Sequence, residues 1–208
     1  MPRIALSESL AFCLFAPLLV LPVGCSRRPA AVPLPELNVS AAADMAVSEA
    51  DNDGDGQLST AELAKYPALA GAMGEWDADS SGKLSAEEIQ KQLQMWRDQG
   101  AAIRTVRCSV TMNGRGLEGA NVEFIPEPFM GDGIKPASGI TGQNGLLLPS
   151  LSKKDLPKDL QSFTGMHLGI YKVRITHPSK KIASEFNTNT TLGAVVGPST
   201  LEVVLAVK

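Results

Sequence analysis

Two acidic segments of twelve residues each constrain this chain more than any other feature of its sequence. Residues 51–62 read DNDGDGQLSTAE and residues 77–88 read DADSSGKLSAEE. Both segments have oxygen-bearing side chains at positions one, three and five, a glycine at position six and a glutamate at position twelve. Glycine accepts the positive φ angle that a tightly wound chain needs. Alternate oxygens on such a loop can all point inward at one hard cation.

Both segments resemble the calcium-binding loop of the EF hand, which has this spacing. Loop one (51–62) matches at every diagnostic position, and loop two (77–88) departs only at Ser81, where Asp or Asn is usual. We therefore expect two Ca²⁺ ions, with Glu62 and Glu88 as bidentate ligands. The alternative is a pair of Asx-rich turns that bind nothing. The expected ligands are Asp51, Asp53, Asp55, the Gln57 carbonyl, Ser59 and Glu62 in loop one, and Asp77, Asp79, Ser81, the Lys83 carbonyl, Ser85 and Glu88 in loop two.

The two loops differ in charge. Loop one offers four carboxylates, whereas Ser81 leaves loop two with three, so we expect loop one to bind Ca²⁺ more tightly. Converging carboxylates repel one another without an ion, so binding should stabilise this part of the chain. If the chain is exported, as its N-terminus predicts (below), we expect weak sites, with dissociation constants on the order of 10⁻⁴–10⁻³ M, and mainly structural ions.

The sequences around the loops favour helices. Ser40 is expected to cap a helix that runs to Ala50. A second helix is expected from Ala86 to Gln99, with Gly100 as its stop. Apolar side chains recur at helical spacing in both segments. These helices would flank the pair of loops.

Short signals between the loops complete the helical prediction. Pro67 is expected to begin a short helix between the two loops. Leu58 and Leu84 occupy the same position in each loop, so we expect them to pair across a short two-stranded bridge. Leu69, Met73 and Trp76 are expected in the core rather than in a groove for a target.

Charge divides the chain into two modules. Residues 36–99 contain 13 acids against 4 bases, a net charge of −9, whereas residues 100–208 carry +4. The total of −3 gives no reason to expect nucleic acid as a partner. A hydrophobic content of 44% excludes a disordered chain. We expect a paired EF-hand domain over residues 38–100 and a second domain over residues 101–208.

The second domain reads as short strands. Val106, Cys108 and Val110 alternate with polar residues, and Leu201 to Val207 alternates in the same way. Similar runs separated by glycine-rich turns predict about seven strands, which suits an antiparallel sandwich. The predicted fold class is therefore α+β, a helical EF-hand pair followed by a β-sandwich.

This domain resembles the carboxypeptidase regulatory-like domains, which share the transthyretin (prealbumin-like) fold. The resemblance covers about 70 residues, and the segment 149–166 looks like an insertion. Such domains are usually non-catalytic spacers or attachment modules in exported proteins. The elements that carry the resemblance are Val106–Thr111, NGRGLEGA at 113–120, Val122–Phe124, the turn at Thr141–Gly145 and Gly169–Val173.

The N-terminus predicts export. Residues 1–24 read as a signal peptide with Arg3 ahead of an apolar run. LPVGC at 21–25 resembles a bacterial lipobox, which implies lipidation of Cys25, although Pro22 departs from the usual pattern. The alternative is a plain signal peptide with an incidental Cys25. Residues 25–37 would form a Pro-rich tether that holds the domains away from a membrane of the bacterial cell envelope. The anchored protein would face the periplasm or the cell surface.

The sequence predicts no catalytic activity. The chain has two histidines, His167 and His177, expected as exposed residues at strand edges, and no sequence motif of a phosphate-binding loop, nucleophile elbow or HExxH zinc site. Cys108 is expected to be a small buried hydrophobe.

The order of lipobox, paired EF hands and β-sandwich resembles that of EF-hand lipoproteins of bacterial envelopes. We expect a non-catalytic, calcium-binding lipoprotein that is anchored in the envelope through Cys25. One alternative is an adhesion module whose sandwich loops bind a glycan or an envelope protein. Another is an accessory protein or an inhibitor of a hydrolase.

Overall fold

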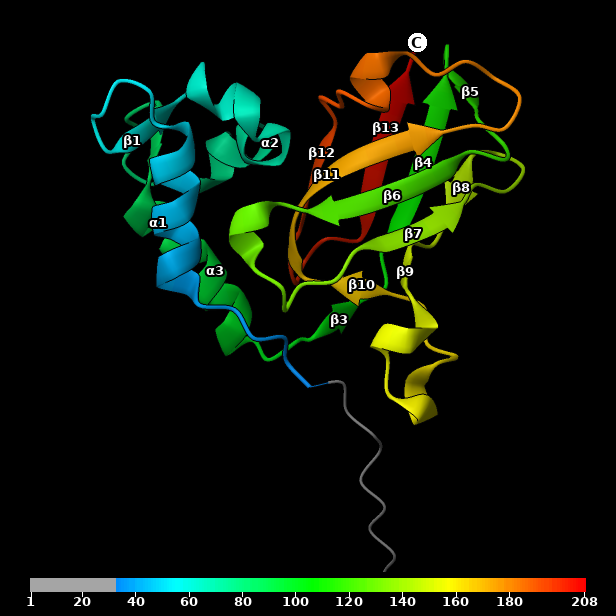
Figure 1. Cartoon of the computed structure of the whole chain (residues 1–208), viewed down its shortest axis with the longest axis horizontal. Helices are drawn as coiled ribbons and strands as arrows, with labels where there is room; N and C mark the ends of the chain where they lie inside the picture. The colour runs from blue at the N-terminus through cyan, green and yellow to red at the C-terminus, as the bar shows by residue number, and fades with distance from the viewer. Residues whose placement is uncertain (1–32) are drawn as a thin grey trace, which may run out of the picture.

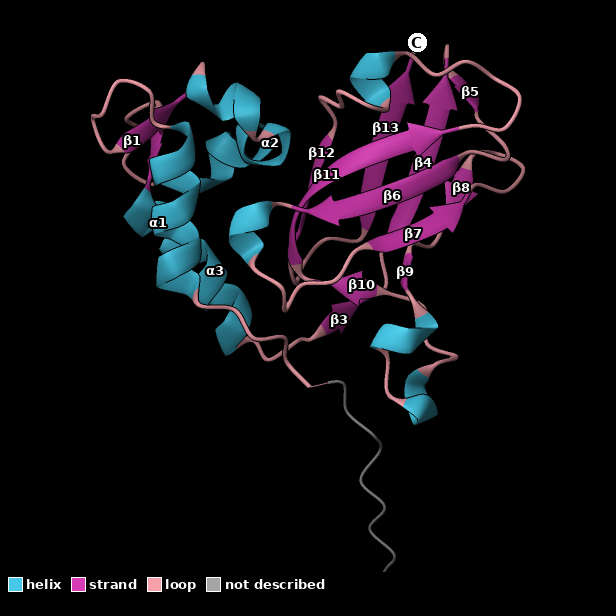
Figure 2. Ribbon diagram, in the orientation of Figure 1, coloured by secondary structure: helices cyan, strands magenta, loops and turns pink. Residues whose placement is uncertain are grey.

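The computed structural model describes residues 33–208. The predicted signal peptide, Cys25 and most of the tether therefore lie outside the described residues. The α-helices lie on one side of the molecule and the two main sheets on the other (Figures 1 and 2), which confirms the prediction of an α+β fold. Among residues 33–208, the structure contains no helix with the length and apolar character that a membrane crossing requires.

The helical half contains three α-helices, two short strands and a turn of 3₁₀ helix. Pro67 opens α2 as predicted, and Gly100, with a φ of 67°, follows the end of α3. The cap of α1 differs from the prediction, because Asn38 rather than Ser40 accepts a hydrogen bond from the Ala41 N–H, at 3.1 Å. The elements are α1 (Val39–Ala50), β1 (Gln57–Ser59), η1 (Glu62–Lys65), α2 (Pro67–Trp76), β2 (Lys83–Ser85) and α3 (Ala86–Asp98).

The β half forms two main sheets. One has five strands in the order β12-β11-β6-β7-β9, and the other has four strands, β13-β4-β5 with β8 also paired to β4. β10 pairs separately with β3. The strands are β3 (Ile103–Arg104), β4 (Arg107–Met112), β5 (Arg115–Gly116), β6 (Asn121–Pro126), β7 (Ala137–Ile140), β8 (Leu146–Leu147), β9 (Ser150–Leu151), β10 (Met166–His167), β11 (Gly169–Thr176), β12 (Gly193–Val196) and β13 (Glu202–Val207). Short 3₁₀ turns lie at η2 (Pro128–Met130), η3 (Lys153–Asp155), η4 (Lys158–Leu160) and η5 (Ser184–Phe186).

Alternating side chains build the core of the β half, as the sequence pattern predicts. Cys108 and Val110 of β4 are fully buried, and so are Val122 and Phe124 of β6. The Phe124 ring meets that of Tyr171 edge to face, with the ring centroids 6.1 Å apart. Burial raises the pKa of Cys108 to about 12, so its thiol stays protonated, and its role as a small buried hydrophobe is confirmed.

Three features of the β half differ from the predictions. The described chain forms eleven strands there, several of only two residues, rather than about seven. β13 pairs with β4 in parallel, with Glu202 opposite Arg107 and Val207 opposite Met112, whereas the other strand pairs in the described chain are antiparallel. The chain reaches β13 from β12 in the other sheet, and such a crossover permits parallel pairing. His167 is buried rather than exposed, because its Nδ1 lies 3.0 Å from the Ala102 carbonyl oxygen.

The helical and β halves pack directly against each other. α2 lies on β12 and β11, and α1 contacts η2 (Figure 1). A Cβ placed on Gly193 of β12 would come within 2.1 Å of the Ala68 backbone nitrogen, so only glycine permits this approach. The Tyr66 ring meets that of Phe129 edge to face, with the ring centroids 5.0 Å apart. One continuous set of buried apolar residues therefore joins the two halves.

Candidate metal centre

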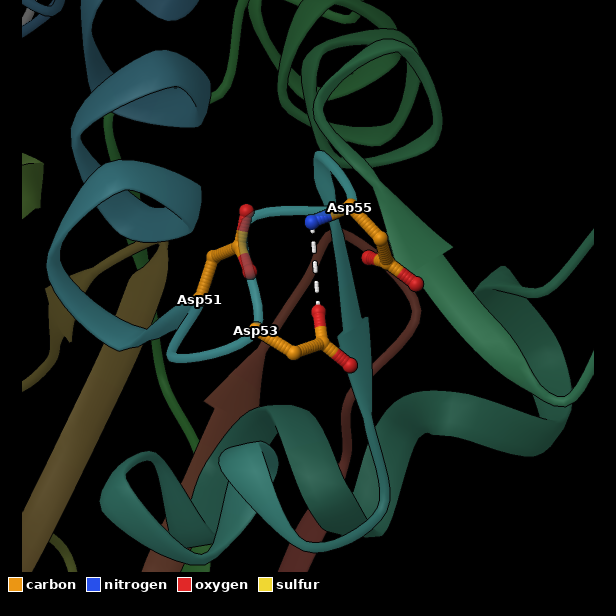
Figure 3. Close-up of side chains that lie close together, drawn as sticks. All are labelled: Asp51, Asp53 and Asp55. Carbon is orange, nitrogen blue, oxygen red and sulfur yellow. Dashed lines mark hydrogen bonds between the residues drawn. The ribbon is translucent and has the colours of Figure 1, made fainter.

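Loop one wraps its first aspartate in backbone amides. Asp51 follows the last residue of α1, and its Oδ1 and Oδ2 accept hydrogen bonds from the N–H groups of Gly54, at 2.7 Å, and Gly56, at 2.9 Å. Asp51, Asp53 and Asp55 each offer one carboxylate oxygen, and these three oxygens lie within 4.8 Å of one another. Figure 3 shows the three side chains and the hydrogen bond from the Asp55 N–H to Asp53 Oδ1, at 3.2 Å. The winding of the loop thus brings three of the predicted ligands together.

Glu62 closes loop one from the start of η1. Its Oε1 accepts the Asn52 N–H at 2.7 Å, and its Oε2 accepts the Ser59 N–H at 2.9 Å and the Ser59 hydroxyl at 2.7 Å. The Ser59 hydroxyl bond and the backbone amides lower the pKa of Glu62 to about 2. A carboxylate held ionised in this way suits a metal ligand. It does not lie within the converging group of three aspartates.

Loop two repeats the arrangement. Asp77 follows the last residue of α2, and its Oδ2 accepts the Gly82 N–H at 2.8 Å. The Ser81 N–H donates to Asp77 Oδ1 and to Asp79 Oδ1, both at 2.9 Å. Here the closing glutamate joins the group, because carboxylate oxygens of Asp77, Asp79 and Glu88 lie within 4.8 Å of one another. The Ser81 hydroxyl and N–H lower the pKa of Asp79.

Glu88 is held by the first turn of α3. Its Oε2 accepts the Ser85 N–H at 2.9 Å and the Ser85 hydroxyl at 3.0 Å, while its Oε1 accepts the Ala78 N–H at 2.7 Å. Ser85 and Glu88 together form a capping box. Burial opposes ionisation of Glu88, but the hydrogen bonds from Ser85 and Ala78 prevail, and its pKa is lowered. Two of the predicted ligands of loop two therefore also cap α3.

A two-stranded antiparallel bridge joins the loops, as predicted. Leu58 of β1 lies opposite Leu84 of β2, and both side chains are fully buried. The predicted carbonyl ligands Gln57 and Lys83 stand on this bridge, in register with Ser85 and Ser59 respectively. Because the bridge fixes one loop against the other, the two sites form one unit.

The side chain of Lys83 has a role that the sequence analysis missed. Its Nζ forms an ion pair and a hydrogen bond with Asp55 Oδ2 across the bridge. The hydrogen bond from the Lys83 ammonium has the largest effect in lowering the pKa of Asp55 below its usual value. The hydrogen bond from the Gln57 N–H lowers it further. No local sequence signal reveals this contact, because the bridge pairs Lys83 with Ser59 rather than with Asp55.

The oxygen-rich donor sets fit a hard cation such as Ca²⁺. Six carboxylates converge in two groups of three, and backbone amides orient several of them. Among the described residues, these are the groups of three or more acidic, histidine or cysteine side chains that could hold a metal ion.

Comparison with protein families agrees with this geometry. A family model described as "EF hand" matches residues 48–65 and 74–93, which include both loops. A search of curated proteins finds no match to the chain. Over these two segments the chain is similar to EF hands, and the match and the two acidic clusters together indicate calcium binding.

Proposed function

We propose that this protein is a non-catalytic calcium-binding protein whose two loops hold mainly structural Ca²⁺ ions. The observation that carries the proposal is the convergence of three carboxylates in each loop, within 4.8 Å of one another. The twelve predicted ligands, from Asp51 to Glu62 and from Asp77 to Glu88, would supply oxygen donors only. Bound ions would offset the repulsion among these carboxylates and hold each loop closed.

The connections of the loops support a structural role. Loop one joins α1 to η1, and loop two joins α2 to α3. α1 contacts η2 and α2 contacts β11 and β12, so an ion in either loop would fix a helix that packs against the β half. Trp76 and Trp96, at the ends of α2 and α3, meet edge to face with the ring centroids 5.6 Å apart. Much of the apolar surface of the helices is therefore already buried inside the molecule.

We also propose that the protein is an envelope lipoprotein whose β half is a prealbumin-like sandwich related to carboxypeptidase regulatory-like domains. The two sheets with alternating buried side chains support the sandwich. The LPVGC segment supports the lipid anchor at Cys25. Fractionation of cells that express Cys25→Ala tests the anchor. Loss of the protein from the membrane fraction is expected, and unchanged fractionation contradicts lipidation.

Calorimetric titration of the full chain with Ca²⁺ tests the proposed metal function. We expect two weak binding events, with dissociation constants on the order of 10⁻⁴–10⁻³ M. Glu62→Gln and Glu88→Gln should each weaken one event by removing a bidentate ligand. Retention of both events in the double variant would show that the ligands are assigned wrongly, and two equal sub-micromolar sites would contradict a structural role.

A second candidate function is recognition of a glycan or protein partner. A cleft of about 590 Å³ lies between α2, α3 and the loop from β12 to β13. Trp96, Glu75 and Glu202 line it, together with polar residues of α3 and of that loop. A glycan array probed with the full chain and with Glu75→Gln/Glu202→Gln tests this function. Binding that the double variant loses supports it, and absence of binding by the wild type contradicts the glycan form of it.

A further inference from the structure

Lys83 belongs to both candidate metal sites. Its backbone carbonyl occupies position seven of loop two, where a main-chain oxygen is the expected ligand. Its side chain crosses the bridge in the opposite direction, and the ammonium pairs with Asp55 Oδ2, at position five of loop one. The bridge pairs Lys83 with Ser59 and so holds Lys83 against loop one. One residue therefore faces both loops through different atoms.

The contact uses one of the two carboxylate oxygens of Asp55, a predicted ligand of loop one. Asp55 Oδ1 already accepts the Gln57 N–H at 2.9 Å, and Oδ2 is taken by Lys83. Both side chains of the pair are only about one-third exposed, at 34% and 36%. The carboxylates of Asp53 and Glu62 attract the same ammonium. Lys83 thus supplies a positive charge to the carboxylates of loop one.

We propose that the Lys83 ammonium competes with Ca²⁺ for Asp55 and thereby sets the affinity of loop one. This inference rests on the proposed calcium function. A divalent ion bound by Asp55 must displace the ammonium or share the carboxylate with it, and the two like charges repel at short range. The ammonium also stabilises the calcium-free loop, because it offsets repulsion among the aspartates. Both effects lower the apparent affinity.

The competition changes the order of affinities expected from composition. Loop one has four carboxylates and loop two has three, which alone favours loop one. With one of the four paired to Lys83, the two loops should bind Ca²⁺ with similar strength. The advantage of loop one should appear only when the ammonium is removed.

Lys83→Met tests the proposal, because methionine keeps an unbranched apolar chain and removes the charge. In the Glu88→Gln background, which leaves loop one as the stronger site, Lys83→Met should tighten Ca²⁺ binding by roughly 3- to 10-fold, as expected for loss of a partly exposed ion pair and of its repulsion. In the Glu62→Gln background, binding by loop two should change little, because its ligand is the backbone carbonyl. Calorimetric titration of the four chains gives both values.

Two control variants distinguish the effect of the Lys83–Asp55 ion pair from the effect of the net charge of the protein. Lys91→Met removes an exposed charge from α3 and should change neither affinity by more than about 2-fold. Lys83→Arg keeps the charge and should retain the wild-type affinity of loop one. Unchanged binding by loop one in Lys83→Met, while the wild type still binds Ca²⁺, overturns the inference alone. Absence of any Ca²⁺ binding by the wild type overturns the proposed function.

Thermal unfolding provides a second readout, because it compares the stability of the calcium-free and calcium-bound proteins. In EDTA, Lys83→Met should unfold at a lower temperature than the wild type, because the aspartates of loop one lose their counter-charge. In saturating Ca²⁺ the two proteins should unfold at similar temperatures, since the ion replaces that charge. An equal loss of stability in both conditions would indicate a merely structural lysine and would contradict the competition.

Discussion

Glu127 Oε2 lies 3.3 Å from Lys172 Nζ at the junction between the helices and the sheets. The Glu127 side chain is fully buried, and neither carboxylate oxygen has a hydrogen-bond partner among the described residues. Burial raises the pKa of Glu127 to about 7, although Lys172 acts in the opposite direction. Lys172 Nζ also lies 5.9 Å from the centroid of the Tyr66 ring. Tyr66 directly follows η1 of the helical half. The junction therefore contains a carboxyl group that is costly to ionise.

Glu127→Gln should make the protein more stable at pH 8 but not at pH 5. Because its pKa rises from 4.5 unfolded to about 7 folded, the folded protein binds the proton more tightly than the unfolded chain. The contribution of protonated Glu127 to the stability of the fold is complete below about pH 4.5 and is lost as the pH rises through about 7. At pH 8 the variant should exceed the wild type by on the order of 3 kcal/mol. Urea unfolding across pH 5–8 measures this difference, and a constant difference would contradict the account.

Leu58→Ala should destabilise the protein by about 2–5 kcal/mol, the usual range for a fully buried leucine. Leu58 is completely buried on the bridge between the two loops, so its loss leaves a cavity beneath both. The matched control is Leu148→Ala, whose side chain is 50% exposed and should cost far less. Chemical denaturation compares the two variants. Equal losses would show that the bridge is not part of the core.

Gly193→Ala should destabilise the contact between α2 and β12. An added Cβ would meet the Ala68 backbone nitrogen at 2.1 Å, so the helix and strand must move apart. We expect a loss of about 1–3 kcal/mol, as for overpacked cores. Gly74→Ala is the matched control, because a Cβ at Gly74 of α2 has no atom within 4 Å. It should raise stability by up to about 1 kcal/mol through helix propensity. A similar effect of both changes on the melting temperature would contradict the close approach.

Local patterns predicted the helical half well. Pro67 and Gly100 act through the φ angles that proline and glycine favour, and the spacing of each loop is also local. These features depend little on the rest of the chain. The pairing of Leu58 with Leu84 follows from their equal positions in the two loops. The choice of Asn38 over Ser40 as helix cap was missed because both residue types cap well.

Contacts between distant segments could not be read from the sequence. The burial of Glu127 depends on how the halves pack, and charged residues are rarely buried in this way. The parallel pairing of β13 with β4 depends on a crossover between sheets. The Lys83 contact with Asp55 requires the register of the bridge as well as the spacing of each loop. The burial of His167 could not be predicted, because nothing in the local sequence places the Ala102 carbonyl against its ring.

Scanning calorimetry of the full chain in EDTA and in Ca²⁺ tests whether the two loops hold calcium ions that stabilise the fold. An ion at 100 times its dissociation constant stabilises the folded state by about 2.7 kcal/mol per site. We predict that Ca²⁺ raises the melting temperature of the wild type by several degrees per site, following the usual relation for a chain of this size. We predict little or no rise in Glu62→Gln/Glu88→Gln. A wild type that does not respond to Ca²⁺, or a double variant that responds equally, would contradict the claim that these two loops hold stabilising calcium ions.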